Sequence, residues 1–405
     1  MKVALYCSRF PLLSETFVVN HVVRLMERGV DVSVVAQDEG DAWGNVPEAL
    51  RETIRSRMVL IPPGWRTALG ALPRLGPLRR QIAGVLSGTR RQAGRYDVIL
   101  AHFGPAGVKA MALRDKGRIE GAIATVFHGF DMSVVNVVAA NLPGYRQLFE
   151  KTEALLPISR LWAGRLEEWG ADPDKIRVLH MGVDMPDHLP ARDSVATPLR
   201  VLQVGRLVEK KGGGYSVEGV LGCTAPVRFD MIGGGPCEQQ WRDQVAAAGA
   251  GERIRFHGPQ PHAAVLAALD QADVFLLPSV TAEGGDMEGI PVALMEAMLR
   301  GCVVVSTFHS GIPELIDDGV SGFLVPERSG EAIAHVLDAI AQGRHDLAAI
   351  RRNAVAKIEQ EFNNDRLTDD LLDILARVAN GQPLHDGEKT AVPRPAPVDR
   401  LADSR

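Results

Sequence analysis

The sequence predicts an α/β protein with two domains, each a doubly wound parallel sheet with helices on its faces. Short apolar runs alternate with helical segments along the first half of the chain, which is the pattern of a parallel sheet. The pattern starts again after a proline-containing segment, 182–198, that is typical of an interdomain linker. A length of 405 residues also exceeds what one hydrophobic core usually serves.

The first domain is expected to span 1–185. Two of its helices can be placed because each helical run stops at a glycine: Gly29 ends the helix at 17–28, and Gly170 ends the helix at 159–169. Apolar runs predict its strands, in order, at 3–7, 30–36, 96–102, 123–127, 154–158 and 176–180.

The second domain is expected to span 198–345. Helices at 346–380 are expected to pack back toward the first domain, and the proline-containing tail 381–405 is expected to be disordered. Ligands of parallel sheets bind beyond the carboxyl ends of the strands, so a cleft between two facing sheets is the expected site. The strands of the second domain are predicted at 199–204, 227–232, 254–256, 274–277 and 303–306.

Composition indicates an ordinary globular protein with no affinity for nucleic acid. The net charge is -5, and 46% of the residues are apolar. The four cysteines are scattered without a CxxC pair, which fits reduced thiols better than disulfides or a zinc site. The chain begins with a short strand and not with the long apolar run of a secretory signal, so we expect the protein to be cytoplasmic.

One stretch, 51–95, is strongly basic. It holds ten arginines against a single acid, Glu52, and apolar residues are interspersed among them. Such a region can lie on an anionic membrane surface, where each basic residue contributes about 1 kcal/mol. A pair of solvated arginine-rich helices is the alternative, and prolines exclude one long helix.

Two glutamates, Glu288 and Glu296, mark the most informative segment of the chain. The apolar residues between them predict a helix, with Glu288 in the preceding loop and Glu296 about two turns inside. Both carboxylates can then face one pocket, where they would accept hydrogen bonds from sugar hydroxyls while the helix N-terminus attracts a phosphate. This combination suits a nucleotide sugar. The alternative is two solvated or capping glutamates.

Basic and glycine-rich loops follow the strands of the second domain. Arg206 and Lys211 follow its first strand, where both can reach a diphosphate and stabilise the charge that develops when a nucleoside diphosphate leaves, without a metal. Glycines 233–235 permit close backbone approach, and the small-residue loop 307–314 could hold phosphate. The dinucleotide fingerprint is absent, so a nicotinamide dehydrogenase is disfavoured.

In the first domain, strand 123–127 delivers His128 to the cleft, where it could donate to a phosphate or to an acceptor hydroxyl, or be purely structural. Glu15 and Thr16 follow the first strand and form either a helix cap or part of an acceptor site. The Asp172-Pro173-Asp174 triplet has the form of a metal-binding DxD motif but is predicted to be a turn.

Together these motifs resemble glycosyltransferase family 4, whose members have the GT-B fold of two facing Rossmann-like domains. The resemblance runs to about residue 380. It is carried by Gly205-Arg206, Lys211-Gly212, Gly233 to Pro236, Phe256-His257-Gly258, Pro278-Ser279, Glu288 to Glu296, Ser310 to Glu314 and Gly322 to Val325.

The resemblance implies a role for each matched residue. Glu288 would contact the donor hexose, Glu296 the ribose, and Arg206 and Lys211 the diphosphate, while His128 would be the active-site histidine. The implied reaction is retaining and needs neither metal nor cofactor, with a UDP-sugar favoured over a GDP-sugar as donor. The rest of the implied donor site is Gly205, Gly234, Gly289, Ile290 and Gly311.

Three further segments resemble the bacterial exopolysaccharide branch, including colanic-acid-type enzymes: 14–17, 102–104 and 285–291. This implies hexose transfer to a polyprenyl-diphosphate-linked glycan at the inner face of the cell membrane, with peripheral membrane attachment. The chain departs from many relatives at 11–14, where a Gly-Gly loop is replaced, which leaves the first domain's contacts open. The rival interpretations are a nucleotide-sugar epimerase of the same fold and a catalytically silent sugar-nucleotide-binding protein.

Overall fold

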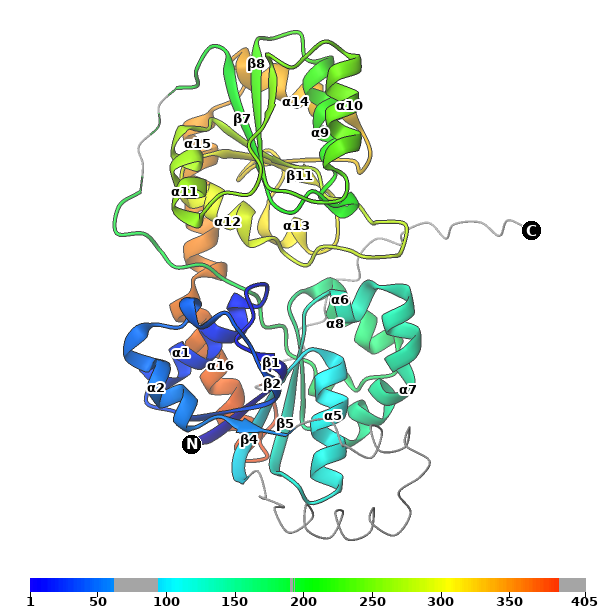
Figure 1. Cartoon of the computed structure of the whole chain (residues 1–405), viewed down its shortest axis with the longest axis vertical. Coiled ribbons are helices and arrows are strands. Elements are labelled where there is room, and N and C mark those ends of the chain that lie inside the picture. The colour runs from blue at the N-terminus through cyan, green and yellow to red at the C-terminus, as the bar shows by residue number, and fades with distance from the viewer. Residues whose placement is uncertain (62–93, 190–191, 193, 386–405) are drawn as a thin grey trace, which may run out of the picture.

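The computed structural model describes residues 1–61, 94–189, 192 and 194–385. The chain forms two lobes, each built around a six-stranded sheet (Figure 1). The strand orders are β3-β2-β1-β4-β5-β6 in the first lobe and β12-β11-β10-β7-β8-β9 in the second. Every strand pair is parallel, so both sheets present the carboxyl ends of all their strands at one edge, as the sequence predicts for a doubly wound fold.

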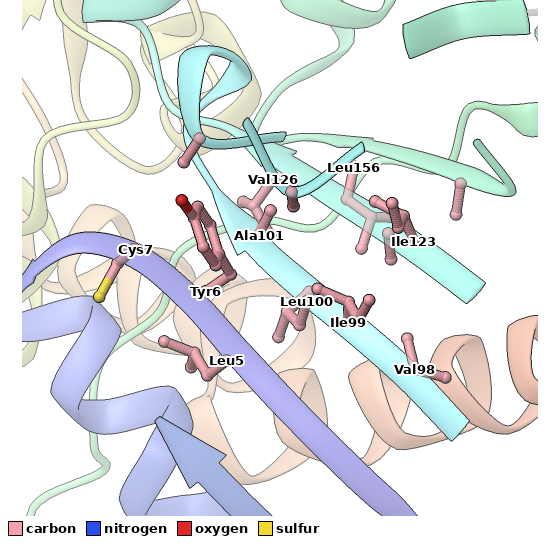
Figure 2. Packing of buried hydrophobic residues seen from close by; sticks show 14 of the residues in the cluster. Leu5, Tyr6, Cys7, Val98, Ile99, Leu100, Ala101, Ile123, Val126 and Leu156 are labelled. Carbon is pink, nitrogen blue, oxygen red and sulfur yellow. The ribbon is translucent and has the colours of Figure 1, made fainter. Parts of the chain in front are cut away.

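The first sheet is buried on both faces because its central strands consist almost entirely of apolar residues. Figure 2 shows the side chains of Leu5 and Tyr6 in this core beside those of Ile99 and Leu100, and all four are at most 1% exposed. The strands are β1 (Lys2–Phe10), β2 (Asp31–Glu39), β3 (Val59–Leu60), β4 (Arg95–His102), β5 (Glu120–Phe127) and β6 (Ala154–Pro157). The helices are α1 (Thr16–Glu27), α2 (Glu48–Ser56), α5 (Gly104–Asp115), α6 (Phe130–Ser133), α7 (Val135–Lys151) and α8 (Arg160–Glu168).

The second sheet is built in the same way from short valine- and leucine-rich strands. Its strands are β7 (Leu199–Val204), β8 (Val227–Ile232), β9 (Ile254–Phe256), β10 (Val274–Leu277), β11 (Val303–Thr307) and β12 (Phe323–Val325). Its helices are α9 (Gly213–Gly222), α10 (Glu238–Ala247), α11 (His262–Gln271), α12 (Val292–Leu299), α13 (Ile312–Leu315) and α14 (Gly330–Ala341).

The chain then returns to the first lobe (Figure 1). Helix α15 (Leu347–Lys357) passes through a π-helical turn, Ile358–Phe362, into α16 (Asn364–Ala379). Buried residues of α16, such as Leu371 and Ile374, belong to the core of the first lobe. Ion pairs also tie α16 to α1: Asp365 lies 3.1 Å from Arg24 and 3.0 Å from Arg28.

Some predicted elements differ from the structure. The segment 176–180 is predicted as a strand but is not one. It pairs with the short edge strand β6 through a single bridge, from Ile176 to Leu155. Strands β3 and β12, of two and three residues, were not predicted. Residues 62–93 of the arginine-rich stretch and the tail from 386 lie outside the described residues. In the described part of the chain, no helix combines the length and the apolar character that a bilayer span requires.

Candidate functional site

The loops that follow β7 and β8 approach each other so closely that they require glycine. Gly233 has a φ of 139°, and a Cβ on it would lie 1.8 Å from the carbonyl oxygen of Gly205. The N–H of Leu207 donates to the carbonyl of Gly234 at 3.0 Å. Two of the predicted donor-site glycines, Gly205 and Gly234, therefore lie in interlocked loops at the carboxyl edge of the second sheet.

Glu288 is the best-defined charged group at this edge. The residue is only 8% exposed, and its Oε2 lies 3.2 Å from Nζ of Lys211. Nζ of Lys210 lies 3.8 Å from Oε1. Burial alone would raise the pKa of Glu288, but the two lysines outweigh it and hold that pKa below its usual value. Glu288 is therefore a carboxylate, and its buried Oε1 has no hydrogen-bond partner among the described residues.

The two lysines are held in place by contacts between the loop after β7 and the loop after β10. Lys210 pairs with Asp286 at 3.0 Å, and the N–H of Val280 donates to the carbonyl of Lys210 at 2.9 Å. Gly212 has a φ of 63°, and a Cβ there would meet the carbonyl of Pro278 at 1.8 Å. Since β7 and β10 are neighbours in the sheet, this packing brings the predicted residues Lys211 and Glu288 into contact.

Arg206 and Glu296 are not part of that contact. Arg206 is exposed, and within the described part of the chain its side chain makes no hydrogen bond or ion pair. Helix α12 begins at Val292, so Glu296 lies about one turn inside it, whereas the sequence predicted about two turns. The carboxylate of Glu296 is half-buried and lies 3.2 Å from Nε2 of the exposed His262.

His128 follows β5 at the carboxyl edge of the first sheet and is 9% exposed. Its ring lies between Phe17 and Phe103, with ring centroids 4.4 and 4.6 Å away. Its backbone N–H donates to Oδ1 of the fully buried Asp131 at 3.0 Å. Three segments of the first domain, α1, the start of α5 and α6, thus fix the backbone and the ring of the predicted active-site histidine.

Behind His128 lies a row of three histidines, His128, His102 and His21. Nε2 of His128 is 3.0 Å from Nδ1 of His102, and Nε2 of His102 is 3.3 Å from Nδ1 of His21. Desolvation, followed by the nearby His21, lowers the pKa of His128 to about 3. Desolvation and then Arg24 lower the pKa of His21 to about 4. The rings are therefore neutral at pH 7, and each has one N–H donor and one acceptor nitrogen. Both ring-to-ring hydrogen bonds can form only if His102 donates to one neighbour and accepts from the other.

The two halves of the site meet at glycines. A Cβ on Gly289 would lie 3.1 Å from the carbonyl of His128 and 2.5 Å from Ile158. A Cβ on Gly311 would lie 2.8 Å from Ile290 and 3.0 Å from Cβ of Ser159. Across the same boundary the N–H of Met287 donates to Oγ of Ser133 at 3.2 Å. The loop that carries Glu288 therefore lies directly against the segment that carries His128.

The other predicted residues lie at the edges of this site. Glu15 is the N-cap residue of α1 but makes no side-chain capping bond; it is half-buried, and burial raises its pKa. Thr16 is exposed. The Asp172 carboxylate accepts from the N–H of Asp174 at 3.0 Å, which confirms that the DxD-like triplet is a turn. No cluster suited to a metal ion occurs among the described side chains.

Four polar residues of the site were missed: Lys210, Asp286, His102 and His21. Three of them left a signal in the sequence. Lys210 and Asp286 are near neighbours of Lys211 and Glu288, and His102 ends a predicted strand, where site residues are expected. His21 lies in the middle of α1, and nothing in its sequence context distinguishes it from a surface histidine.

Comparison with known proteins assigns both halves to sugar transfer. Residues 14–186 match the family profile "Glycosyltransferase Family 4", and residues 186–357 match "Glycosyl transferases group 1". WcaL of Salmonella typhimurium, assigned to colanic acid biosynthesis as a glycosyltransferase, is 39% identical over 93% of this chain and 100% of its own length. The amylovoran biosynthesis glycosyltransferase AmsK of Erwinia amylovora is 36% identical over 94% of this chain and 100% of its own.

Solved structures share the fold at low sequence identity. HepE of Anabaena in complex with UDP has a TM-score of 0.69 at 19% identity, covering 93% of this chain and 99% of its own. The apo lipopolysaccharide outer core galactosyltransferase WaaB has a TM-score of 0.67 at 17% identity, covering 92% and 99%. The fold is therefore GT-B, and the chain belongs to glycosyltransferase family 4, in its bacterial exopolysaccharide branch of colanic-acid type.

Proposed function

We propose that the protein transfers a hexose from a UDP-sugar to a lipid-linked oligosaccharide in exopolysaccharide biosynthesis, with retention of anomeric configuration and without a metal ion. One observation carries the proposal. The buried Glu288 carboxylate is fixed by Lys211, and one of its oxygens has no hydrogen-bond partner among the described residues, next to the segment of His128. An unpaired buried carboxylate oxygen is costly, and a sugar hydroxyl is the kind of donor that would satisfy it.

The donor diphosphate would be bound by Arg206 and Lys211. The side chain of Arg206 is exposed and has no partner among the residues that the structure describes, so it can pair with a phosphate without breaking a contact seen there. As the bond to the sugar breaks, negative charge grows on the departing diphosphate, and two fixed cations stabilise it. The choice of UDP over GDP is supported by fold relatives: HepE of Anabaena has been crystallised with UDP and with UDP-glucose.

The remaining donor contacts follow from where the predicted residues lie. The loops that follow β7, β8, β10 and β11 carry the other predicted donor residues, Gly205, Gly234, Gly289, Ile290 and Gly311, while Glu296 on α12 would hold the ribose. His128 is neutral and would donate to, or accept from, a group of the transferred sugar or the incoming hydroxyl. Glu15 and Thr16, at the start of α1, would contact the acceptor.

The acceptor proposal is supported by the relatives. WcaL and AmsK are assigned to colanic acid and amylovoran biosynthesis, and both align with this chain along their full length. A polyprenyl-diphosphate-linked glycan at the inner face of the cell membrane is the expected acceptor, and the arginine-rich stretch 51–95 would hold the protein peripherally to that anionic surface. Replacing five arginines between Arg74 and Arg95 with serine should release it from anionic vesicles; persistent attachment would exclude this anchor.

The decisive experiment offers a panel of nucleotide sugars with and without a lipid extract. Diphosphate release that depends on the lipid fraction supports transfer, and NMR of the product tests retention through the anomeric coupling. Consumption of donor without any acceptor would favour the epimerase. Binding without release of diphosphate would favour the silent sugar-nucleotide-binding protein. Addition of a chelator is expected to leave the rate unchanged.

A further inference from the structure

His309 lies in the loop between β11 and α13 and contacts the backbone of Glu288. The side chain of His309 is fully buried. Its Nε2 is 3.1 Å from the backbone nitrogen of Glu288, and its Nδ1 is 2.6 Å from Oε1 of Glu327. None of the donor contacts described above uses His309 or Glu327.

The partners of His309 determine where its proton lies. A backbone N–H can only donate, so Nε2 of His309 must carry a lone pair to accept from Glu288. The single ring proton is then on Nδ1, where it donates to the carboxylate of Glu327. A ring protonated on both nitrogens would point an N–H at the N–H of Glu288. The arrangement therefore favours the tautomer with its proton on Nδ1 and its lone pair on Nε2.

Glu327 is itself fixed as a carboxylate. Besides the His309 proton, it accepts the backbone N–H of Thr281 at 3.0 Å. Burial alone would raise the pKa of Glu327, but these hydrogen bonds, together with the charge of Arg328 at 3.3 Å, outweigh it, and that pKa lies below its usual value. Glu327 thus joins three loops, because Thr281 follows β10, His309 follows β11 and Glu327 itself follows β12.

These three strands are neighbours in the sheet, so the contacts form a continuous support under the loop of Glu288. We propose that His309 and Glu327 are positioning residues for sugar transfer, which fix the peptide of Glu288 so that its carboxylate meets the transferred hexose. The inference rests on the proposed function of Glu288. Neither residue is expected to touch the substrate, so their loss acts only through Glu288.

Substitutions can separate the hydrogen bonds from the shape of His309. In His309→Gln the amide oxygen can accept from Glu288 and the amide N–H can donate to Glu327, so most turnover should remain. His309→Leu offers neither group and should lower kcat about tenfold or more, as expected for one buried hydrogen bond, while the Kd for UDP changes less than about twofold. His335→Leu is the matched control, since His335 is exposed on α14, and it should leave kcat unchanged.

A double-mutant cycle tests whether His309 acts through Glu288. In a Glu288→Ala background, His309→Leu should cause little further loss of kcat, because the carboxylate that it positions is already gone. If the fold losses of kcat in Glu288→Ala and His309→Leu multiply in the double variant, the proposal is overturned. Equal kcat values for the Gln and Leu variants of His309 would also overturn it.

A measurement in the resting protein needs no activity and no variant that fails to fold. Long-range ¹H–¹⁵N spectra of the histidine-labelled protein should show the His309 ring protonated on Nδ1 and bare on Nε2, assigned by the signal lost in His309→Gln. A proton on Nε2 would overturn the inference even if transfer is confirmed. Conversely, the expected tautomer in a protein that transfers no sugar would mean that the proposed function, and not the geometry of this support, is wrong.

Discussion

At the scale of single residues, the charge on Glu288 is set by its neighbours. The carboxylate is buried, a position that disfavours ionisation, yet Lys211 at 3.2 Å and Lys210 at 3.8 Å keep it ionised. Lys211 is thus already engaged before any donor binds, and a bound diphosphate must share it with Glu288. The exposed Arg206 has no such competitor, so the two predicted diphosphate ligands are expected to behave differently when each is removed.

Glu288→Gln should lower kcat about a hundredfold or more, because a neutral amide loses the charge-assisted contact to the transferred sugar that strengthens as the bond breaks. The Kd for UDP should change little, since UDP lacks that sugar. Steady-state kinetics and calorimetry measure the two effects. Glu283→Gln is the control, being an exposed glutamate of the same loop. Unchanged turnover in Glu288→Gln would remove Glu288 from the reaction.

Arg206→Ala and Lys211→Ala should each weaken UDP binding by about 1.5–3 kcal/mol, the contribution of a charge-assisted hydrogen bond. Only Lys211→Ala should also lower the melting temperature, because it leaves the buried Glu288 carboxylate with Lys210 at 3.8 Å as its nearest cation. Calorimetry with UDP and thermal unfolding without it separate the two effects. A Lys211→Ala variant that melts at the same temperature as Arg206→Ala would contradict the structural role assigned to Lys211.

At the scale of elements, the sequence predicted the parts of the fold that depend on hydrophobic pattern. All five strands predicted in the second domain are present, because each is a short segment of continuous or alternating apolar residues. Strand β3 was missed and the strand predicted at 176–180 was wrong, because a segment at the edge of a sheet needs only a few hydrogen bonds and leaves little pattern. Pairing across distant segments, such as His309 with Glu327, leaves no periodic signal at all.

The same limit applies to the site. Lys211, in a loop after a strand, and Glu288, in the loop before a helix, were both predicted to belong to the donor site, and the structure brings them into contact. The contacts of His128 were not expected: His102 and His21 lie on different elements from it, and only the fold shows that the three rings form a row. Glu296 was placed a turn too deep because the helix begins after Pro291, and helix boundaries are the least certain feature of a sequence pattern.

Helix α8 of the first lobe is capped by a residue of the second. Oε1 of Glu314 accepts the backbone N–H of Arg160 at 2.7 Å and that of Leu161 at 3.4 Å, while its Oε2 lies 3.0 Å from Nε2 of His180. The cap joins a helix N-terminus, which favours a negative charge, to a carboxylate on α13. This contact couples the stability of α8 to the contact between the lobes.

Glu314→Ala should therefore lower the free energy of unfolding by about 1–3 kcal/mol, because two N–H groups at the start of α8 lose their acceptor. Glu314→Gln keeps an acceptor oxygen and should cost less. Urea unfolding followed by circular dichroism measures both variants under the same conditions. An alanine variant as stable as the parent chain would show that the cap contributes nothing to stability.

At the scale of the whole molecule, the first lobe holds three histidines in a neutral form. The pKa of His21 is lowered to about 4 and that of His128 to about 3, and desolvation together with its two neighbours holds the pKa of His102 well below its usual value. In the unfolded chain all three titrate near pH 6.5. Asp131, whose pKa is raised by burial, contributes in the opposite sense where it titrates.

Between about pH 6.5 and pH 4 the unfolded chain therefore binds up to three more protons than the folded one, and stability rises with pH wherever that is true. The stability that depends on neutral histidines is fully present above pH 6.5. It is lost on acidification at up to about 1.4 kcal/mol per pH unit for each histidine. Urea unfolding at pH 7 and pH 5 should show this loss, and His102→Leu, which removes one of the three, should show a smaller one. Asp131 and the other carboxylates are present in both proteins, so the difference in pH dependence between the parent chain and His102→Leu reports on the histidine row. An identical pH dependence in the variant would mean that His102 is protonated in the folded protein, and the row of neutral rings behind His128 would have to be abandoned.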